Sequence, residues 1–590
     1  MIIQFPDKNN KWVQTNQGDL SGNVWSSWRL DFDSNPGVVK VSPSLVIQAS
    51  SLTSSLLVYP VAFCRSSSDS YDRWWAVCNN ILYKAYTNTA GSIGAFEVDP
   101  IANSPATNYL YSDLVEWELT SDASLSLFCT TSSMVCKLTN GAWVSNWYTD
   151  LTGNPVLTPN VPHPMCVGFN NLLLIGHGNY VASVDNAGTV NNTRLTFEKE
   201  YQVIWIRSSN SAIYVGCRNT RGRQAKVFIW DGNSENFNYD YKVGAGETFA
   251  GVIKDDICYT INNLGQLLAF NGGGFVEVAR LPITEKIKRW LNSNNLQVHK
   301  NGMAIVDNKI HILLNASLGT SGSSAYYNEL LENMLSGIWE YTPEHGLYHK
   351  YALNKSSDYG SPIIRMAGAL TDISATGLPT AKYKFLAGCQ FYTQDGQNVT
   401  TEVGAIERVQ DDEYAKVGYL ITPKIPTNEI EENWQKIIVI IKKLLNSTDK
   451  IKVKYRTDYV DYGATKIGLS GLWTTLSAFT CSNIDSSAVV GDEVEILGGI
   501  GSGISANISS IDSSAVVIDE IVTGVSGYNR FRVSNWKDVG TTINTQGLRH
   551  FELPIDARSS WVQIKVVFFF TGEEEFEKLA IKSEVQVPLK

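Results

Sequence analysis

Short apolar runs alternate with tight polar turns along the chain from Leu56 to Gln394. In each unit, a run rich in β-branched and aromatic residues ends in a two-residue polar turn and is followed by a second such run. Asn and Asp tolerate the left-handed conformation that a two-residue hairpin requires, so the pattern predicts antiparallel β-hairpins. The turn pairs recur at roughly 40 to 50 residues, which is typical of four-stranded propeller blades; they are Asn79-Asn80, Ser132-Ser133, Asn170-Asn171, Asn210-Ser211, Asp255-Asp256 and Asp307-Asn308.

This repeat predicts an all-β fold with a degenerate β-propeller of six or seven blades over residues 51–395. A single blade cannot bury both of its faces, whereas a ring of blades buries both and shields most strand edges. We expect Asn79-Asn80, Asn170-Asn171 and Asp255-Asp256 to occupy equivalent hairpins. The candidate blades are 51–95, 110–150, 160–200, 201–245, 246–282, 300–353 and 362–395. Two segments, 283–291 and 325–335, have apolar residues at helical spacing and are expected to be short inter-blade or insertion helices.

Residues 1–50 form a leader in which Val38, Lys40 and Ser42 alternate as in a strand. Such a strand can complete the last blade and close the ring, or it can lie against a neighbouring subunit. Both arrangements remain open from the sequence.

After residue 396 the pattern changes to that of a β-sandwich. In the segment 451–457 apolar and basic residues alternate, which places one face of a strand in a core. The basic face, formed by Lys452, Lys454 and Arg456, is expected to face water.

A small barrel is expected to interrupt this sandwich at 475–535 and to divide it into the parts 396–474 and 536–590. The segment contains the same Ile-Asp-Ser-Ser-Ala-Val-Val sequence twice, within 483–490 and 510–517. A Gly-Asp turn, an alternating strand and a glycine-rich hairpin lie between the copies and favour an SH3-like β-barrel. We expect the two copies to occupy related pairs of strands.

Composition fits a large, multidomain β protein. With 590 residues, the chain is too long for one core, so roughly two to four domains are expected. The net charge of -10 and the lack of a basic block argue against coating nucleic acid by neutralising phosphates. A weakly acidic wall can still line a channel through which DNA slides.

The cysteines predict folding in a reducing compartment. They are odd in number and most lie inside apolar runs, so buried free thiols are favoured over a disulfide framework; they are Cys64, Cys78, Cys129, Cys136, Cys166, Cys217, Cys258, Cys389 and Cys481. The first residues lack the pattern of a secretory signal, and the apolar stretches 437–445 and 566–570 are too short to span a bilayer. We expect synthesis in the cytoplasm without membrane insertion.

No group of residues in the sequence favours catalysis. The glycines of 498–503 lack the Lys-Ser/Thr and the helix of a phosphate-binding loop. Asp72, Asp231 and Asp255-Asp256 lie in turns where Asp is common, and Asp411-Asp412-Glu413 lacks the spacing of a calcium loop.

The histidines do not predict a metal site either. His345 and His349 are close in sequence, but Gly346 between them favours a hairpin over one helix face, and no Cys or carboxylate cluster completes a zinc site; the others are His163, His177, His299, His311 and His550. We therefore expect neither an enzyme nor a cofactor.

Both ends of the chain resemble structural proteins of tailed bacteriophages. The resemblance rests on short motifs near the two ends, whereas the middle of the chain is similar only in architecture. The N-terminal motifs are Phe5-Pro6-Asp7, the segment from Gly18 to Trp25 and the segment from Asn35 to Pro43. The C-terminal motifs are Tyr455-Arg456-Thr457, the segment from Val490 to Val494, Asn535-Trp536, the segment from Phe551 to Pro554 and the segment from Trp561 to Lys565. The family analogue is the tail nozzle (tail tube B-like) protein of short-tailed phages, a β-propeller with added β-domains.

This resemblance implies a virion tail component that forms a homo-oligomeric ring, expected to be a hexamer, around the DNA exit channel. Its partners would be further copies of itself, adjacent tail or adaptor proteins, and duplex DNA passing without sequence-specific binding. The alternative is a glycan-binding or glycan-cleaving propeller, as a tail-tip adhesin or a bacterial protein, because aromatic hairpins can stack on sugars. A cellular interaction propeller is disfavoured since WD and kelch motifs are missing.

Overall fold

The computed structural model describes residues 2–6, 12–13, 24–33, 37–50, 60–66, 73–78, 81–87, 93–99, 112–122, 125–145, 147–148, 157–282, 296–315, 336–353, 364–372, 385–395, 398–414, 417–426, 432–441, 449–457, 466–480, 488–496, 505–512, 515–521, 527–534, 536–545, 548–570 and 574–584. These residues form β-strands and turns, with only Trp147–Tyr148 in helical conformation. Over these ranges, no helix has the length and apolar character needed to cross a membrane.

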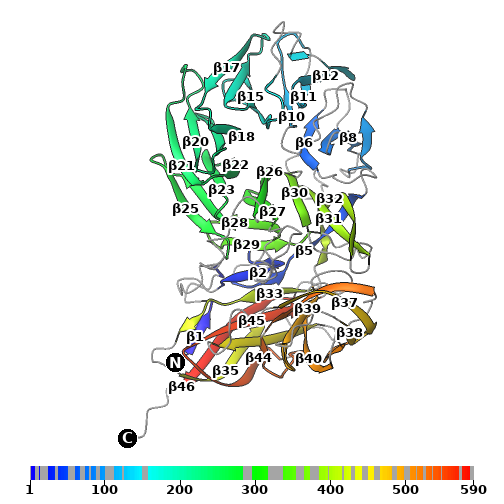
Figure 1. Ribbon diagram of the computed structural model, residues 1–590. Helices are drawn as coiled ribbons and strands as arrows, with labels where there is room; N and C mark the ends of the chain where they lie inside the picture. The colour runs from blue at the N-terminus through cyan, green and yellow to red at the C-terminus, as the bar shows by residue number, and fades with distance from the viewer. Residues whose placement is uncertain are drawn as a thin grey trace.

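Seven four-stranded antiparallel sheets stand in a ring (Figure 1). Blades 1 to 3 are β6 (Pro60–Ser66), β7 (Arg73–Cys78), β8 (Ile81–Tyr86) and β9 (Glu97–Asp99); β10 (Leu114–Trp117), β11 (Ser126–Thr130), β12 (Val135–Thr139) and β13 (Ala142–Val144); and β14 (Met165–Val167), β15 (Leu173–His177), β16 (Tyr180–Val184) and β17 (Val190–Thr196). Blades 4 and 5 are β18 (Tyr201–Ser208), β19 (Ile213–Asn219), β20 (Gln224–Trp230) and β21 (Tyr239–Ala245); and β22 (Thr248–Lys254), β23 (Ile257–Asn262), β24 (Gln266–Phe270) and β25 (Phe275–Arg280). Blades 6 and 7 are β26 (Gln297–Val306), β27 (Lys309–Asn315), β28 (Gly337–Thr342) and β29 (Gly346–Tyr351); and β30 (Ile364–Asp372), β31 (Phe385–Asp395), β32 (Asn398–Tyr414) and β5 (Pro43–Ser50).

The first strand of each blade contacts the first strand of the next, and the contacts continue from β30 back to β6. This closed arrangement is a β-propeller with seven blades, one of the two numbers that the sequence left open. The burial of the strands explains the repeat pattern. The second strand of blade 4, Ile213–Asn219, is buried almost throughout because neighbouring blades cover both of its faces, whereas the outer strand Val190–Thr196 of blade 3 alternates in exposure.

A strand from the N-terminal segment closes the ring, as one of the two predicted arrangements proposed. β5 pairs antiparallel with β32 and is the outer strand of blade 7. The closing strand begins at Pro43, later than the predicted alternation at 38–42, and β32 continues to Tyr414, past the predicted propeller end at 395.

The predicted equivalence of the hairpin turns is correct for part of the ring. Asn170-Asn171, Asn210-Ser211, Asp255-Asp256 and Asp307-Asn308 each join the first and second strands of their blades, and five of these residues have positive φ. Asn79-Asn80, the third pair that was expected at an equivalent hairpin, lies outside the described residues. Ser132-Ser133 joins the second and third strands of blade 2, so not every turn pair of the repeat occupies the same hairpin. A tight turn indicates a hairpin but not which two strands it connects.

Several predicted features lie outside the described residues. They are the two helical patches at 283–291 and 325–335, Asp72, Cys481 and the glycines of 498–503. The other eight cysteines are free, and six of them are buried, as predicted.

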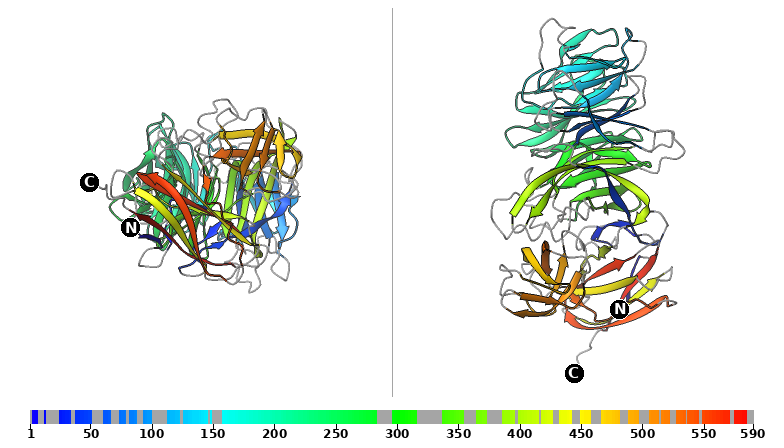
Figure 2. Two further views of the ribbon diagram at one scale, coloured as in Figure 1. Left: turned by 90° about the horizontal axis from the view of Figure 1, so that it is seen from below. Right: turned by 90° about the vertical axis from the view of Figure 1, so that its right-hand side faces the viewer.

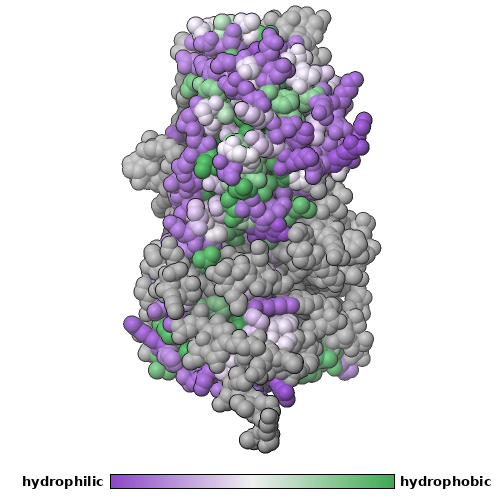
Figure 3. Space-filling model, turned by 90° about the vertical axis from the view of Figure 1, so that its left-hand side faces the viewer, coloured by the Kyte–Doolittle hydropathy of each residue, from purple (hydrophilic) through white to green (hydrophobic). Residues whose placement is uncertain are grey.

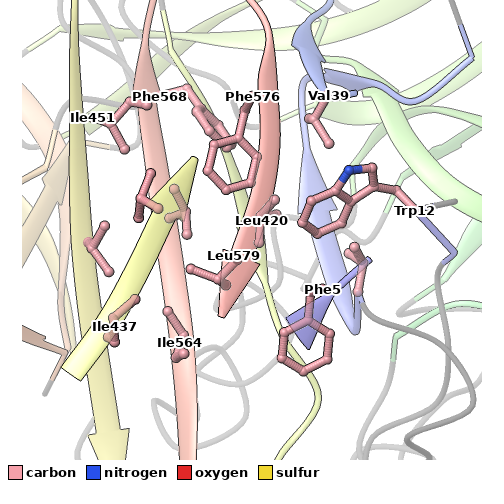
Figure 4. Packing of buried hydrophobic residues seen from close by; sticks show 14 of the residues in the cluster. Phe5, Trp12, Val39, Leu420, Ile437, Ile451, Ile564, Phe568, Phe576 and Leu579 are labelled. Atoms are coloured by element: carbon pink, nitrogen blue, oxygen red, sulfur yellow. The ribbon is translucent and has the colours of Figure 1, made fainter. Parts of the chain in front are cut away.

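A second β unit consists of two sheets around one core. One sheet has the order β1 (Ile2–Phe5), β46 (Phe576–Glu584), β35 (Glu432–Ile441) and β44 (His550–Ser559). The other has the order β2 (Ser26–Trp28), β33 (Gly418–Ile421), β45 (Trp561–Phe569), β36 (Lys450–Thr457) and β43 (Lys537–Asp538), with β34 (Ile425–Pro426) beside β45. Figure 4 shows how residues of both ends of the chain share this core: Phe5 and Trp12 lie with Phe576 and Leu579, and the rings of Trp12 and Phe576 are 5.6 Å apart.

The second unit lies at the rim of the propeller, beside blades 6 and 7 (Figures 1 and 2). The N-terminal segment joins the two parts: β2 and β3 (Leu30–Asp31) contact β29, and β3 pairs with β4 (Lys40–Val41) just before the chain enters blade 7. Gly418 permits this close approach, because a Cβ there would lie 2.9 Å from the carbonyl oxygen of Arg29.

A closed barrel is inserted between β36 and β43. Its strands, in barrel order, are β37 (Lys466–Thr475), β38 (Ala478–Thr480), β41 (Ala515–Ile518), β40 (Ser505–Asp512), β39 (Glu493–Ile496) and β42 (Gly527–Ser534). The barrel therefore begins nine residues before the predicted boundary at 475. The second copy of the internal repeat spans the β40–β41 hairpin, but Ala488–Val490 of the first copy is not in a strand. Over the residues described in both copies, Ala488–Val490 and Ala515–Val517, the copies do not occupy related strands, so the same short sequence adopts different structures here.

The prediction that Lys452, Lys454 and Arg456 face water was wrong. These side chains are buried on the side of β36 that the barrel covers, where Lys454 Nζ lies 3.0 Å from Glu493 of β39. Strand alternation identified the two faces correctly. It could not show that a later insertion covers the polar one.

Trp205 fills the space between blades 4 and 5, and two glycines make room for it. A Cβ on Gly216 would lie 2.0 Å from the Trp205 indole, and one on Gly251 would lie 2.7 Å from it. The indole N–H donates to Thr248 Oγ1 over 3.2 Å, which fixes the ring in this slot.

We expect Gly216→Ala to lower the free energy of unfolding by about 1–3 kcal/mol, because the added methyl group forces the buried indole to move. Urea unfolding with intrinsic fluorescence measures this loss. Gly273→Ala is the matched control, since the nearest atom to its Cβ would be 3.8 Å away, and it should change stability little. Equal effects of the two variants would contradict the packing described for Trp205.

Candidate functional site

A polar segment of blade 6 occupies the middle of the propeller. The pairing of β26 with β27 shifts register between Val298 and Met303, so the residues between them leave the ladder. Of these residues, which are His299, Lys300, Asn301 and Gly302, Lys300 and Asn301 interact with side chains of blades 2 and 4 on other sides of the ring.

The central segment is held by one carboxylate and one guanidinium group. Lys300 Nζ lies 3.0 Å from Asp113 Oδ2, and Asn301 Nδ2 donates to Asp113 Oδ1 over 2.8 Å. Arg207 donates from Nη2 to the Lys300 carbonyl oxygen over 3.1 Å and from Nε to Gly251 O over 2.8 Å. The network therefore links blades 2, 4, 5 and 6 across the axis.

Burial sets the electrostatics of this network. The Lys300 side chain is 0% exposed and that of Asp113 is 5% exposed. Burial lowers the pKa of Lys300, which the Asp113 carboxylate counteracts. Asp113 also accepts the backbone N–H groups of Leu114 and Met165, so both of its oxygens are used within the fold. Asp113 and Lys300 therefore form a structural ion pair, and neither oxygen of Asp113 is directed at a bound substrate.

The sequence analysis did not predict this network. The signal for it was the polar run His299–Gly302 inside an otherwise apolar strand, because a polar interruption in a buried strand requires partners.

The carboxylates considered in the sequence analysis have local roles where the structure describes them. Asp231 accepts the backbone N–H groups of Asn233 and Ser234 in an exposed turn, and hydrogen bonds from Ser234 hold its pKa below the usual range. Asp256 accepts the Asn210 backbone N–H over 2.8 Å and so joins the turns of blades 4 and 5. Asp411-Asp412-Glu413 lies along β32.

The structure does not bring His345 and His349 together as a pair of metal ligands. His349 Nδ1 accepts the Arg29 backbone N–H over 3.1 Å, and its Nε2 lies 3.1 Å from Ser336 O, so both nitrogens are engaged. His345 lies instead near Asp33 and Glu344, the one group of three metal-capable side chains found among the described residues.

A second buried ionic network joins the N-terminal segment to blade 6. Glu340 lies 2.8 Å from Lys350 Nζ and 2.9 Å from His311 Nε2, and it accepts a hydrogen bond from Tyr348. Burial opposes ionisation of Glu340, but Lys350 and His311 hold its pKa well below the usual value. Lys350 also lies 3.6 Å from Asp31, so the network fastens the two parts of the chain together.

His349 at this junction makes stability depend on pH. Burial lowers its pKa to about 3, so the folded chain holds the neutral ring. The contribution of His349 to the free energy of unfolding is complete above about pH 6.5, the pKa of histidine in the unfolded chain. It is lost as the pH falls toward 3.

We therefore expect about 2 kcal/mol of stability from this one residue to be lost between pH 7 and pH 5. His163, whose pKa burial lowers to about 4, acts in the same direction. Urea midpoints at pH 7, 6 and 5 measure the slope. His349→Asn should reduce that slope, and an unchanged slope would contradict a buried neutral His349.

No protein-family model matches the chain, and no curated protein matches it. Its fold is similar to solved propellers at low sequence identity. The β-propeller domain of Myceliophteria thermophila Cps50 (Swd1) is 8% identical, with a TM-score of 0.36, over 62% of this chain and 100% of that chain. The WD40 repeats of RRP9 are 11% identical, with a TM-score of 0.36, over 62% and 99%. BBS1N in complex with ARL6DN is 9% identical, with a TM-score of 0.36, over 62% and 98%. The assignment of a β-propeller therefore rests on the strand topology of the chain itself.

Proposed function

We propose that the protein is a structural component of a tailed-bacteriophage virion, located in the tail as a nozzle or tail-tube component. In this proposal it forms a homo-oligomeric ring, expected to be a hexamer, around the DNA exit channel. The two sheets of the second unit act as a β-sandwich, and the inserted barrel is SH3-like.

The observation that carries the proposal is the occupied centre of the propeller. The Asp113–Lys300 ion pair and Arg207 connect opposite blades through the axis, and their polar groups bond to one another. A channel for duplex DNA therefore has to lie between several chains and not through one chain. The same contacts disfavour catalysis or ligand binding at the centre of the propeller.

The junction between the two parts supports a role as a rigid building block. The N-terminal segment contributes strands to both sheets of the second unit and then the closing strand of the propeller. The buried Lys350–Asp31 contact, and the core of the second unit that includes Tyr348 of blade 6, fix the parts against each other. Rigid subunits suit a ring that transmits load between neighbouring tail proteins.

The partners follow from this role. They are further copies of the chain, the adjacent tail or adaptor proteins, and duplex DNA in transit. Because a conduit that bound phosphates tightly would hinder ejection, we expect sparse, salt-sensitive contacts to DNA without sequence specificity.

Immunogold labelling of the phage particles with antibodies against the chain tests the location. We expect label at the tail, next to the capsid vertex from which DNA leaves. Particles without label, or label confined to fibre tips, would overturn the proposal.

One observation favours the glycan-binding alternative. Tyr239 on β21 is 63% exposed, and Tyr241, two residues further along the strand, packs against Phe270, which packs against Phe275. Figure 3 shows apolar residues gathered midway along this side of the molecule. Aromatic faces of this kind stack on sugars. Glycan binding that is abolished by Tyr239→Ala, or cleavage of host polysaccharide, would favour the alternative; without either, the patch is an ordinary packing surface.

A further inference from the structure

We propose that Asp33, Glu344 and His345 bind a divalent transition-metal ion, with Zn²⁺ as the best match. The ion would fasten the N-terminal segment to the β28–β29 hairpin of blade 6. This inference is independent of the proposed virion role.

The three side chains can converge on one ion. One ligand atom from each lies within 4.8 Å of the others, and His345 Nε2 is 3.8 Å from an Asp33 oxygen. Two ligands of a tetrahedral Zn²⁺, each at about 2.0–2.2 Å, lie roughly 3.4 Å apart, so small side-chain movements suffice. Glu344 is exposed and can move to complete the site, which also opens it to ions from solvent.

The tautomer of His345 points to a ligand. Its Nδ1 lies 2.8 Å from the Trp12 carbonyl oxygen, which can only accept, so Nδ1 carries a proton. The other ring nitrogen, Nε2, faces an Asp33 carboxylate oxygen, and the 3.8 Å between them is too long for a hydrogen bond. A cation between the two groups would contact both of them, and metal-binding histidines commonly donate their other N–H to a carbonyl group in this way.

The surroundings hold two of the ligands in place. His345 is 6% exposed, its ring packs near Phe32 and Tyr348, and its backbone N–H donates to Thr342 Oγ1. The Asp33 backbone N–H donates to Asp31 Oδ1 over 3.0 Å. The second Asp33 oxygen pairs with Lys309, which leaves the first for a metal.

The donor set selects the class of ion. One imidazole nitrogen with two carboxylates suits Zn²⁺ or a similar transition metal, with water as the fourth ligand. Ca²⁺ and Mg²⁺ prefer oxygen ligands alone and more of them. We therefore expect Zn²⁺ to bind at least tenfold more tightly than either.

Isothermal titration of the full chain with ZnCl₂, and visible absorption after addition of CoCl₂, test the site. We expect one Zn²⁺ per chain and a tetrahedral Co²⁺ spectrum. Glu344 is the exposed ligand, so Glu344→Gln should fold normally and weaken Zn²⁺ binding at least tenfold. Glu235→Gln, at another exposed position, is the control and should bind as the unaltered protein does.

His345→Gln should abolish the Co²⁺ spectrum, and added Zn²⁺ should raise the melting temperature of the unaltered protein but not that of this variant. Absence of Zn²⁺ binding at micromolar concentration would overturn the proposal. Binding that both ligand variants retain would also overturn it, because the metal would then lie elsewhere, for example on a thiol.

Discussion

Replacing Asp113 with alanine is expected to lower the free energy of unfolding by about 3–5 kcal/mol. The change leaves the fully buried Lys300 ammonium without its carboxylate and removes the acceptor of Asn301. Burial of an unpaired charge costs far more than loss of a surface contact, since water cannot replace the missing partner. The shift in the urea midpoint at unchanged slope measures the loss.

Two further variants separate the ion pair from a general effect of lost charge. Glu235→Ala removes the carboxylate of an exposed residue and should change stability by less than about 0.5 kcal/mol. Asp113→Ala combined with Lys300→Met should recover a large part of the loss, because no charge is then left unpaired. A loss below about 1 kcal/mol in Asp113→Ala would contradict an occupied, dehydrated propeller centre.

Glu493→Ala is expected to have a comparable effect, of about 3–5 kcal/mol, on the attachment of the barrel. Glu493 lies 3.0 Å from Lys454 Nζ and 3.2 Å from Lys565 Nζ, and all three side chains are at most 1% exposed. Without this carboxylate the Lys454 ammonium is left beside the neutral Asn507 Oδ1, 3.2 Å away, and can regain water only if the barrel moves away from the sheet. Lys565 keeps Glu495 at 3.2 Å. Limited proteolysis should therefore release a fragment containing residues 466–534, and hydrogen exchange should increase in β36 and β45.

A surface ion pair provides the control for this prediction. Glu552 lies 2.7 Å from Lys436 Nζ but is 50% exposed. Glu552→Ala should cost less than about 1 kcal/mol, since exposed pairs contribute little. If Glu493→Ala leaves the barrel as resistant to proteolysis as Glu552→Ala does, the buried contacts do not hold it.

Local features of the fold could be predicted from the sequence because their causes are local. Asp255-Asp256 and Asp307-Asn308 form tight turns with positive φ, as their residue types indicate. The strands of the second unit, such as Trp561–Phe569, were visible as alternating or apolar runs.

Features that depend on distant parts of the chain could not be predicted. The partner of β1 is β46 and that of β2 is β33, and no local pattern specifies such pairings. Lys454 has the sequence context of a solvent-facing residue, yet a barrel inserted after its strand buries it. The network at the centre of the propeller was not predicted for the same reason, because Asp113 and Lys300 come together only when the ring closes. His345 was considered as a ligand with the wrong partner, because its proximity to Asp33 arises from the path of the N-terminal segment.

Cryo-electron microscopy of the native assembly that contains this chain tests the proposed virion role most directly. We predict a hexameric ring of this chain in the tail, with DNA density on the ring axis between subunits and protein density filling the centre of each propeller. DNA density inside a propeller, or the chain present only as a separate fibre tip, would contradict the account.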